Sequence, residues 1–169
     1  YSPRGNFYAT LLIHPTESAD KVALRSFAAA LALRDACRAV TGTDAGLSLK
    51  WPNDVLLNGG KLAGILLESS GAGGRVAHLA IGIGVNLIAA PSPEHVEPGA
   101  VTPVSLLGET GVRATPEAFL TALATTFDHW ERMFVTQGFA PLREAWLASA
   151  TRLGEVITAR TGRESHVGR

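Results

Sequence analysis

The amino-acid sequence predicts an α+β fold, in which an antiparallel or mixed sheet from the first half of the chain packs against helices. Short apolar runs follow one another through brief turns between residues 47 and 85. Such turns join antiparallel neighbours, because parallel strands need a long crossover connection. Two longer segments, on either side of this region, have apolar residues three and four positions apart and predict amphipathic helices that cover the sheet.

The elements of the first half can be placed in chain order. A β-branched and aromatic run at residues 7–13 predicts a strand that is covered on both faces. The apolar pattern after it predicts a helix of about 22 residues, capped by Thr16 or Ser18 and ended by Gly42. Further strands are predicted at residues 47–51, 55–57, 62–68 and 76–85. Asn58-Gly59-Gly60 is the expected hairpin turn, since Asn-Gly readily adopts positive φ angles.

The second half is predicted to be irregular and then helical. Prolines at positions 91, 93, 98 and 103 indicate a segment without regular structure. Thr115 as the cap and Pro116 at the first helical position begin a long helix. Its predicted buried stripe comprises Phe119, Leu120, Leu123, Ala124, Phe127, Trp130, Met133 and Phe134. A shorter helix from Pro141 follows, and then a strand at residues 154–160 that is expected to have no later strand to pair with.

Composition excludes several classes of protein. Fifteen basic and fifteen acidic residues give no net charge, and the sequence has no helix-turn-helix, so a DNA-binding domain is not expected in this chain. No apolar run approaches the roughly 20 residues of a membrane span, and the first residues lack the layout of a signal peptide. Cys37 is the single cysteine, which excludes an intrachain disulfide. A cytoplasmic protein with Cys37 in its core is expected.

Polar residues gather at the mouth of the predicted hairpin. Lys50-Trp51-Pro52-Asn53-Asp54 is, from local chemistry alone, more often a turn, since Asn and Asp side chains bond the nearby backbone. The hairpin, however, folds Lys61 back toward Asn53 and Asp54. Amide, carboxylate and ammonium groups at one point are suited to a ribose, a phosphate-bound Mg²⁺ or a basic partner.

Glycines interrupt two of the predicted strands. Gly64 lies within an apolar strand, where glycine often marks a bulge or the close approach of a ligand. Gly82 and Gly84 are two residues apart, so they face the same side and leave a strip without side chains. Two explanations stay open: a helix packed closely across the strip, or a flat ligand on bare backbone. The pattern is not a dinucleotide fingerprint, because Asn86 and a proline-rich segment follow it.

Three blocks in this order resemble the catalytic signature of biotin protein ligases: residues 50–55, 60–68 and 82–86. Residues 2–8 also resemble the segment that enters the family's core, and Trp146-Leu147 its last core helix. The resemblance therefore covers most of the chain. It implies the biotin/lipoate ligase catalytic core, which is similar to class II aminoacyl-tRNA synthetases.

This resemblance implies an activity and roles for residues. Family members activate biotin with ATP and Mg²⁺ to biotinyl-5′-adenylate and transfer it to a lysine of a biotin carboxyl carrier protein domain of acetyl-CoA carboxylase or a related carboxylase. Lys61 matches the catalytic lysine. The expected ATP or adenylate contacts are Asn53, Asp54, Lys61 and Asn86, with Asp54 also a candidate for Mg²⁺, and no metal cluster of protein ligands is expected. The expected biotin contacts are Lys61, Gly64, Gly82 and Gly84.

The same resemblance suggests a domain organisation. Residues 1–152 are expected to form the catalytic domain without the family's upstream Gly/Arg-rich loop, and residues 153–169 to begin a truncated SH3-like domain. A chain without that loop is expected to release the adenylate readily. The resemblance is compatible with a homodimer. Two alternatives stay open: a lipoate ligase or lipoyl/octanoyl transferase of the same superfamily, and a non-catalytic biotin-binding fragment.

Overall fold

The computed structural model describes residues 3–73, 75–96, 99–160 and 164–168, and it contains a five-stranded antiparallel sheet. The strands are β1 (Phe7–Ile13), β2 (Leu47–Lys50), β3 (Asp54–Leu57), β4 (Gly60–Ala72) and β5 (Arg75–Val85), in the order β1-β5-β4-β3-β2. From β2 to β5, each strand pairs with the next one in the sequence. The predicted α+β class with an antiparallel sheet is therefore confirmed.

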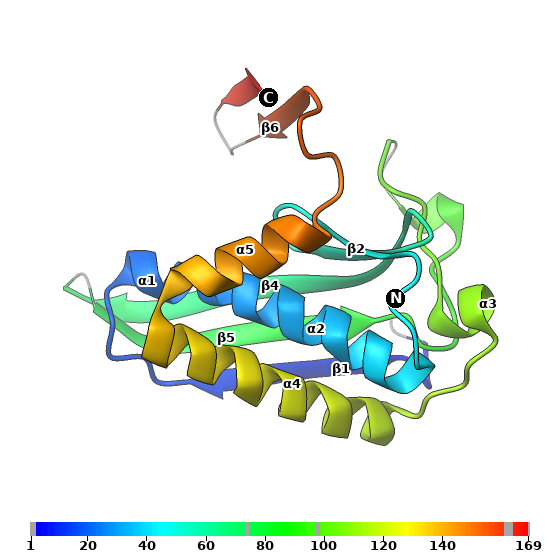
Figure 1. The fold of residues 1–169 in the computed structure, drawn as a ribbon, viewed down its shortest axis with the longest axis horizontal. Coiled ribbons are helices and arrows are strands. Elements are labelled where there is room, and N and C mark those ends of the chain that lie inside the picture. Colours follow the sequence, from blue (N-terminus) through cyan, green and yellow to red (C-terminus); the bar gives the residue numbers. More distant parts are fainter. Residues whose placement is uncertain (1–2, 74, 97–98, 161–163, 169) are drawn as a thin grey trace.

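Three helices cover one face of this sheet. In chain order, the α-helices of the described residues are α1 (Ala19–Ala23), α2 (Arg25–Thr41), α3 (Leu106–Thr110), α4 (Pro116–Gln137) and α5 (Phe139–Ser149), with a short 3₁₀ turn, η1 (Pro93–His95). The covering layer consists of α2, α4 and α5. Figure 1 shows α2, α4 and α5 lying together in front of the strands. The central helix, α2, buries Ala28, Ala29, Ala30, Ala32 and Ala36. These small side chains allow it to approach the sheet closely, so the core lies between α2 and the strands.

The first helical segment differs from the prediction. The prediction of a single helix of about 22 residues is wrong, because the chain turns at Leu24, between α1 and α2. The Leu24 N–H donates to the Lys21 carbonyl at 3.1 Å, a tighter closure than that of an α-helix. Ser18 is the N-cap but its side chain makes no capping bond. Gly42 ends α2 in the left-handed region at φ 75°, as predicted.

Two predicted burial patterns are also wrong. Residues 7–13 do form β1, but Tyr8 and Leu12 are about half exposed, because β1 is an edge strand with helices on one face only. In α4, which begins at Pro116 with Thr115 as its cap, Leu120 and Ala124 are exposed. They lie on the flank of α4 beside the edge strand β1, where they line a groove with Leu11.

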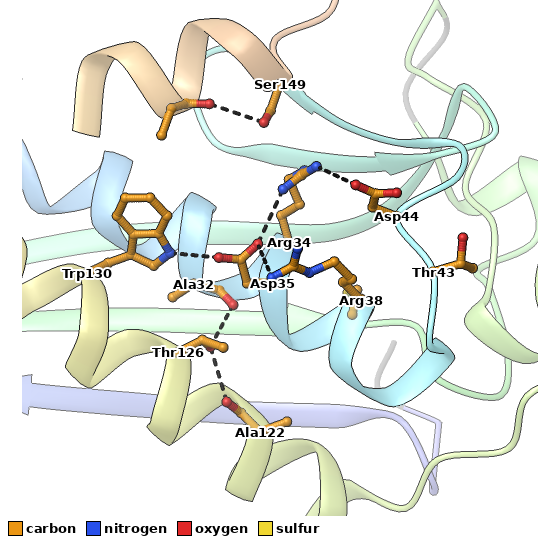
Figure 2. Close-up of polar contacts among 12 residues, drawn as sticks. Ala32, Arg34, Asp35, Arg38, Thr43, Asp44, Ala122, Thr126, Trp130 and Ser149 are labelled. Carbon is orange, nitrogen blue, oxygen red and sulfur yellow. Dashed lines mark hydrogen bonds and ion pairs between the residues drawn. The ribbon is translucent and has the colours of Figure 1, made fainter. Parts of the chain in front are cut away.

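Polar contacts join the helices to one another and to the segment before β2 (Figure 2). The Thr126 hydroxyl in α4 donates to the Ala32 carbonyl in α2 at 2.8 Å. The Trp130 indole donates to Asp35 at 2.9 Å, and Arg34 bridges Asp35 and Asp44. The buried Arg25 is similarly paired with Glu17 and Glu131. These contacts pair many of the polar groups that helix packing removes from water, although Arg25 Nη1, Arg34 Nε and Glu131 Oε2 are buried without a hydrogen-bond partner.

The end of the chain forms a separate small sheet. β6 (Ile157–Arg160) pairs in antiparallel register with β7 (Ser165–Gly168), and Figure 1 shows β6 standing away from the main body. The prediction that this strand has no partner is therefore wrong. Within β7 only Val167 has strong β propensity, which is too weak a signal to predict a strand. Among the described helices, none has the length and apolar character needed to cross a membrane.

Candidate functional site

One row of residues crosses the whole sheet on the face that carries no helix layer. Lys50 pairs with Asp54, Asp54 with Gly64, Gly64 with Gly84, and Gly84 with Tyr8. Side chains alternate between the faces of a strand, and the neighbours of these residues point into the helical core. The sequence blocks that suggested a site thus come from different strands and meet in a single row.

Gly84 in this row and Gly82, two residues before it on the same face of β5, leave an open strip of backbone. A Cβ added to Gly82 would lie 3.6 Å from the Leu66 carbonyl oxygen, and one added to Gly84 would lie 3.5 Å from the Tyr8 ring. These are ordinary van der Waals distances, so internal packing does not require glycine at either position. The strip also faces away from α2, because Ile81, Ile83 and Val85 occupy the helix side. The first of the two explanations for the strip, a helix packed closely across it, is therefore wrong.

A bulge places Lys61 over this strip. Lys61 and Gly64 are three residues apart and would lie on opposite faces of a regular strand. The pairing of β3 with β4 shifts between Val55 and Leu56, so that Val55 faces Ala63 while Leu56 faces Lys61. The extra residue, Leu62, is buried beside Ala63, and the bulge turns Lys61 to the open face. The Lys61 ammonium consequently lies 3.6 Å from where a Cβ of Gly64 would stand.

Asp54 holds that ammonium. Lys61 Nζ is 2.7 Å from Asp54 Oδ1, and Lys50 Nζ is 3.7 Å from Oδ2 of the same carboxylate. The Asp54 side chain is only 10% exposed, whereas that of Lys61 is 41% exposed. Oδ1 is shielded from solvent and accepts no hydrogen bond of regular geometry, so its charge is offset by the ion pair. Lys61 is therefore tethered at its tip yet accessible.

Both asparagines of the predicted site use their amide groups within the protein. Asn53 Nδ2 donates to the Ile65 carbonyl at 2.7 Å, and the Ile65 N–H donates to the Asn53 carbonyl at 3.0 Å. Asn86 Nδ2 donates to the Val104 carbonyl at 3.0 Å. Asn53 thereby fixes the turn before β3 against β4, and Asn86 fixes the segment before α3 against the end of β5.

Two adjoining clefts open on this face. The first encloses about 590 Å³ and is lined by Tyr8, Asn53, Lys61, Leu66, Gly82 and their neighbours. The second encloses about 470 Å³ between the sheet and residues 91–96 and 100–103, with Asn86 and His95 in its wall. Lys61, Gly64, Gly84 and Tyr8 line both clefts. The arrangement therefore puts one accessible cation at the junction of two ligand-sized spaces.

Sequence reasoning did not assign Tyr8 and Leu66 to the site. Tyr8 lies over Gly84, and Leu66 in β4 is a large apolar residue that is 60% exposed. The alternation in residues 7–13 was a usable signal, because it places Tyr8 and Thr10 on the face opposite to Phe7. Tyr8 and Leu66 both lie on the same open face as the residues that the sequence did single out, which are Asp54, Gly64, Gly82 and Gly84.

The chain is similar to known ligases. It matches the profile of the Biotin/lipoate A/B protein ligase family over residues 1–86. It is 58% identical to a biotin--[acetyl-CoA-carboxylase] ligase of Paracoccus denitrificans, a match that covers 97% of this chain and 69% of that protein. It is 30% identical to the bifunctional ligase/repressor BirA of Bacillus subtilis, over 95% of this chain and 49% of that one.

Solved structures agree on the fold. The biotin protein ligase from Aquifex aeolicus in complex with biotin and ATP superposes with a TM-score of 0.81 at 24% identity, covering 98% of this chain and 66% of that one. The apo form of the Aquifex protein gives a TM-score of 0.82. At this level of identity the likeness is one of fold.

Proposed function

This chain belongs to the biotin/lipoate A/B protein ligase family, and from that premise we propose that it is the catalytic part of a biotin–[acetyl-CoA-carboxylase] ligase. The 58% identity to the Paracoccus ligase supports biotin as the substrate. In this proposal residues 1–152 are the catalytic domain and residues 153–169 begin a second, SH3-like domain. The separate β6–β7 sheet is consistent with that boundary.

The proposed reaction has two steps. A biotin carboxylate oxygen attacks the α-phosphorus of ATP, the bond to pyrophosphate breaks, and biotinyl-5′-AMP forms. The amine of a carrier-protein lysine then attacks the acyl carbon, and AMP leaves. Both the carboxylate and the phosphates are anions, so the first step needs a cation between them.

The position of Lys61 is the observation that carries the proposal. Its ammonium stands where the two clefts meet, directly above the glycine strip. From there it can offset the negative charge that builds on the α-phosphate oxygens during attack. We assign the first cleft to biotin and the second to the nucleotide, so that the carboxylate and the α-phosphate both reach Lys61.

The first cleft fits a small bicyclic ring. Its volume of about 590 Å³ lies within the usual range of small-molecule sites. Gly64, Gly82 and Gly84 supply a flat floor without side chains. Tyr8 and Leu66 border it with aromatic and aliphatic surface. In this proposal the glycines are selected by the ligand, because the protein's own packing does not demand them.

The structure bears on the expected Mg²⁺ contact as well. Asp54 is already paired with two ammonium groups, and no set of three or more His, Cys, Asp or Glu among the described residues can hold a metal. This donor set does not fit a protein-held magnesium site. We therefore propose that Asp54 positions Lys61, and that Asn86 acts by holding the wall of the nucleotide cleft.

An octanoyl transferase is disfavoured by the state of Cys37. That reaction would need a thiolate nucleophile, and this residue is the only cysteine in the sequence. Cys37 is fully buried in α2, and burial raises the pKa of its thiol to about 12. The thiol is therefore protonated and inaccessible at neutral pH.

The direct test combines the chain with MgATP and either biotin or lipoate and measures pyrophosphate release. A carrier domain is then added and probed for bound biotin. We expect biotin-dependent release followed by labelling of the carrier. Release with lipoate but not biotin would identify the sister activity. Biotin binding without any pyrophosphate would support a non-catalytic fragment.

A further inference from the structure

Two histidines face each other at the far end of the open face. His14 follows β1 directly, and His78 lies in β5 one position before Leu79, the last partner in the β1–β5 register. Both are an even number of residues from the Tyr8–Gly84 pair and so share its face. Six residues along a strand separate them from that pair, a distance of about 20 Å. They are thus well outside the proposed ligase site.

The two rings approach each other through their nitrogens. His14 Nδ1 and His78 Nδ1 are 3.0 Å apart, and the ring centroids are 4.8 Å apart at 74°. His14 Nδ1 also lies 3.3 Å from the Ala77 carbonyl oxygen. A contact of this length between two imidazole nitrogens requires a proton on one and a lone pair on the other. When both are deprotonated at Nδ1, two lone pairs meet in the same small space.

That spacing suits two ligands of one metal ion. Imidazole nitrogens bind zinc at about 2.0–2.1 Å, so two of them at a bond angle of about 90–110° lie roughly 3.0–3.4 Å apart. The observed 3.0 Å falls within this range. The two histidines lie directly beyond the last β1–β5 pair, Ile13 and Leu79, so the strand pairing holds their backbones near each other. Rotation of the side chains would then turn the two lone pairs toward a common point.

We propose that His14 and His78 form a binding site for a divalent transition-metal ion such as Zn²⁺, Ni²⁺ or Cu²⁺. Imidazole favours these ions over Mg²⁺ and Ca²⁺, which prefer oxygen ligands. No third His, Cys, Asp or Glu ligand completes the set among the described residues. Water or a small anion therefore fills the other positions, and the bound ion exchanges readily. The site is distinct from any Mg²⁺ that accompanies ATP.

Metal binding here has a structural consequence for β1. This strand is at the edge of the sheet, and its other end carries Tyr8 and Thr10, which line the first cleft. An ion bound by both His14 and His78 would link the end of β1 to β5. Because the ion binds the folded arrangement, it stabilises that pairing. Backbone amides of β1 are therefore expected to exchange more slowly with solvent when zinc is present.

The test is a titration of the full chain with ZnCl₂ or NiCl₂ alone, followed by calorimetry. His14→Gln and His78→Gln are compared with His129→Gln, which removes an exposed imidazole on α4. We expect each of the first two variants to bind the ion at least tenfold more weakly, and His129→Gln to bind it as the parent does. Equal affinity in all four chains would overturn the proposal.

A second set of measurements distinguishes loss of the metal site from loss of the fold in a variant. Thermal unfolding in EDTA compares the folding of each chain without metal, and hydrogen exchange follows the β1 amides with and without zinc. Slower exchange in the parent and in His129→Gln, but not in His14→Gln or His78→Gln, supports the site. Zinc-dependent protection that persists in both of those variants contradicts it, as does protection by MgCl₂ at the same concentration.

Discussion

The carboxylate of Asp54 lies 2.7 Å from the ammonium of Lys61 and holds it above Gly64. Asp54 is nearly buried, whereas Lys61 is accessible from both clefts. An ion pair with one buried partner fixes the position of the exposed one better than a surface pair does. This relationship underlies the first two predictions.

Replacing Lys61 by alanine should suppress adenylate formation far more than biotin binding. Lys61 is assigned to charge that develops in the transition state, and loss of one such group costs about 10²–10³ in rate. Pyrophosphate release and biotin affinity, measured separately, check this. Lys21→Ala, on the exposed side of α1, is the matched control. Unchanged pyrophosphate release in Lys61→Ala would exclude the assigned role.

Asp54→Asn should lower kcat for pyrophosphate release by about tenfold or more while changing the KM for biotin little. The isosteric amide keeps the shape but removes the charge that tethers Lys61. Steady-state kinetics with varied biotin separates the two constants. Glu68→Gln, which removes a carboxylate from the same sheet face two residues beyond Leu66, is the control. A rise in KM with kcat unchanged would assign Asp54 to binding instead.

Glycine substitutions should separate the ligand's demands from those of the fold. Gly82→Ala is expected to leave the free energy of unfolding nearly unchanged, because its Cβ meets atoms at 3.6 Å or more. It should nevertheless weaken biotin binding, since the methyl group rises from the cleft floor. Gly60→Ala is the counterpart: its Cβ would collide with a Val104 methyl group and should destabilise the fold. Urea unfolding and biotin titration of both variants test this pair.

If Gly82→Ala binds biotin as tightly as the parent, the glycine strip is not the floor of the biotin site. The first cleft would then need another occupant.

The thiol of Cys37 should resist modification in the folded protein. Burial raises its pKa to about 12, from an ordinary value near 9. The folded state therefore keeps the proton over this interval while the unfolded state loses it, so the contribution of this group to stability falls as the pH rises from about 9 to 12. A thiol reagent at pH 8 should label one group per chain in denaturant and none, on the same timescale, without it. Rapid labelling of the native chain would show that Cys37 is accessible.

The indole of Trp130 should contribute to the stability of the fold but not to biotin binding. Trp130→Phe removes the hydrogen bond to Asp35 and should lower the free energy of unfolding by roughly 1–2 kcal/mol. Because the contact lies between α2 and α4 (Figure 2), on the helical side of the sheet, the KM for biotin should not change. Denaturant titration and steady-state kinetics give the two values. A changed KM would indicate coupling between the helix layer and the cleft.

Local sequence was enough to predict most elements of the fold and three of the segments that line the candidate site. Asn58 and Gly59 form the predicted turn with φ angles of 51° and 80°, and Gly42 and Thr115-Pro116 bound their helices as expected. These signals are reliable because a positive φ, a cap or a proline ring acts through neighbouring atoms. The residue blocks 50–55, 60–68 and 82–86 likewise stand out in the sequence by their residue types and spacing.

Only the tertiary structure decided which way those residues face. Alternation alone would turn Lys61 toward the helices, and the bulge at Leu62 reverses it, because pairing with β3 absorbs one extra residue there. The edge position of β1 and the exposure of Leu120 likewise depend on where the sheet ends, which no local pattern states. The sequence by itself thus determined the elements and the chemical groups of the site, through short-range conformational preferences. Strand register, set by contacts between residues distant in the chain, decided that Lys61, Asp54 and the glycines share one face.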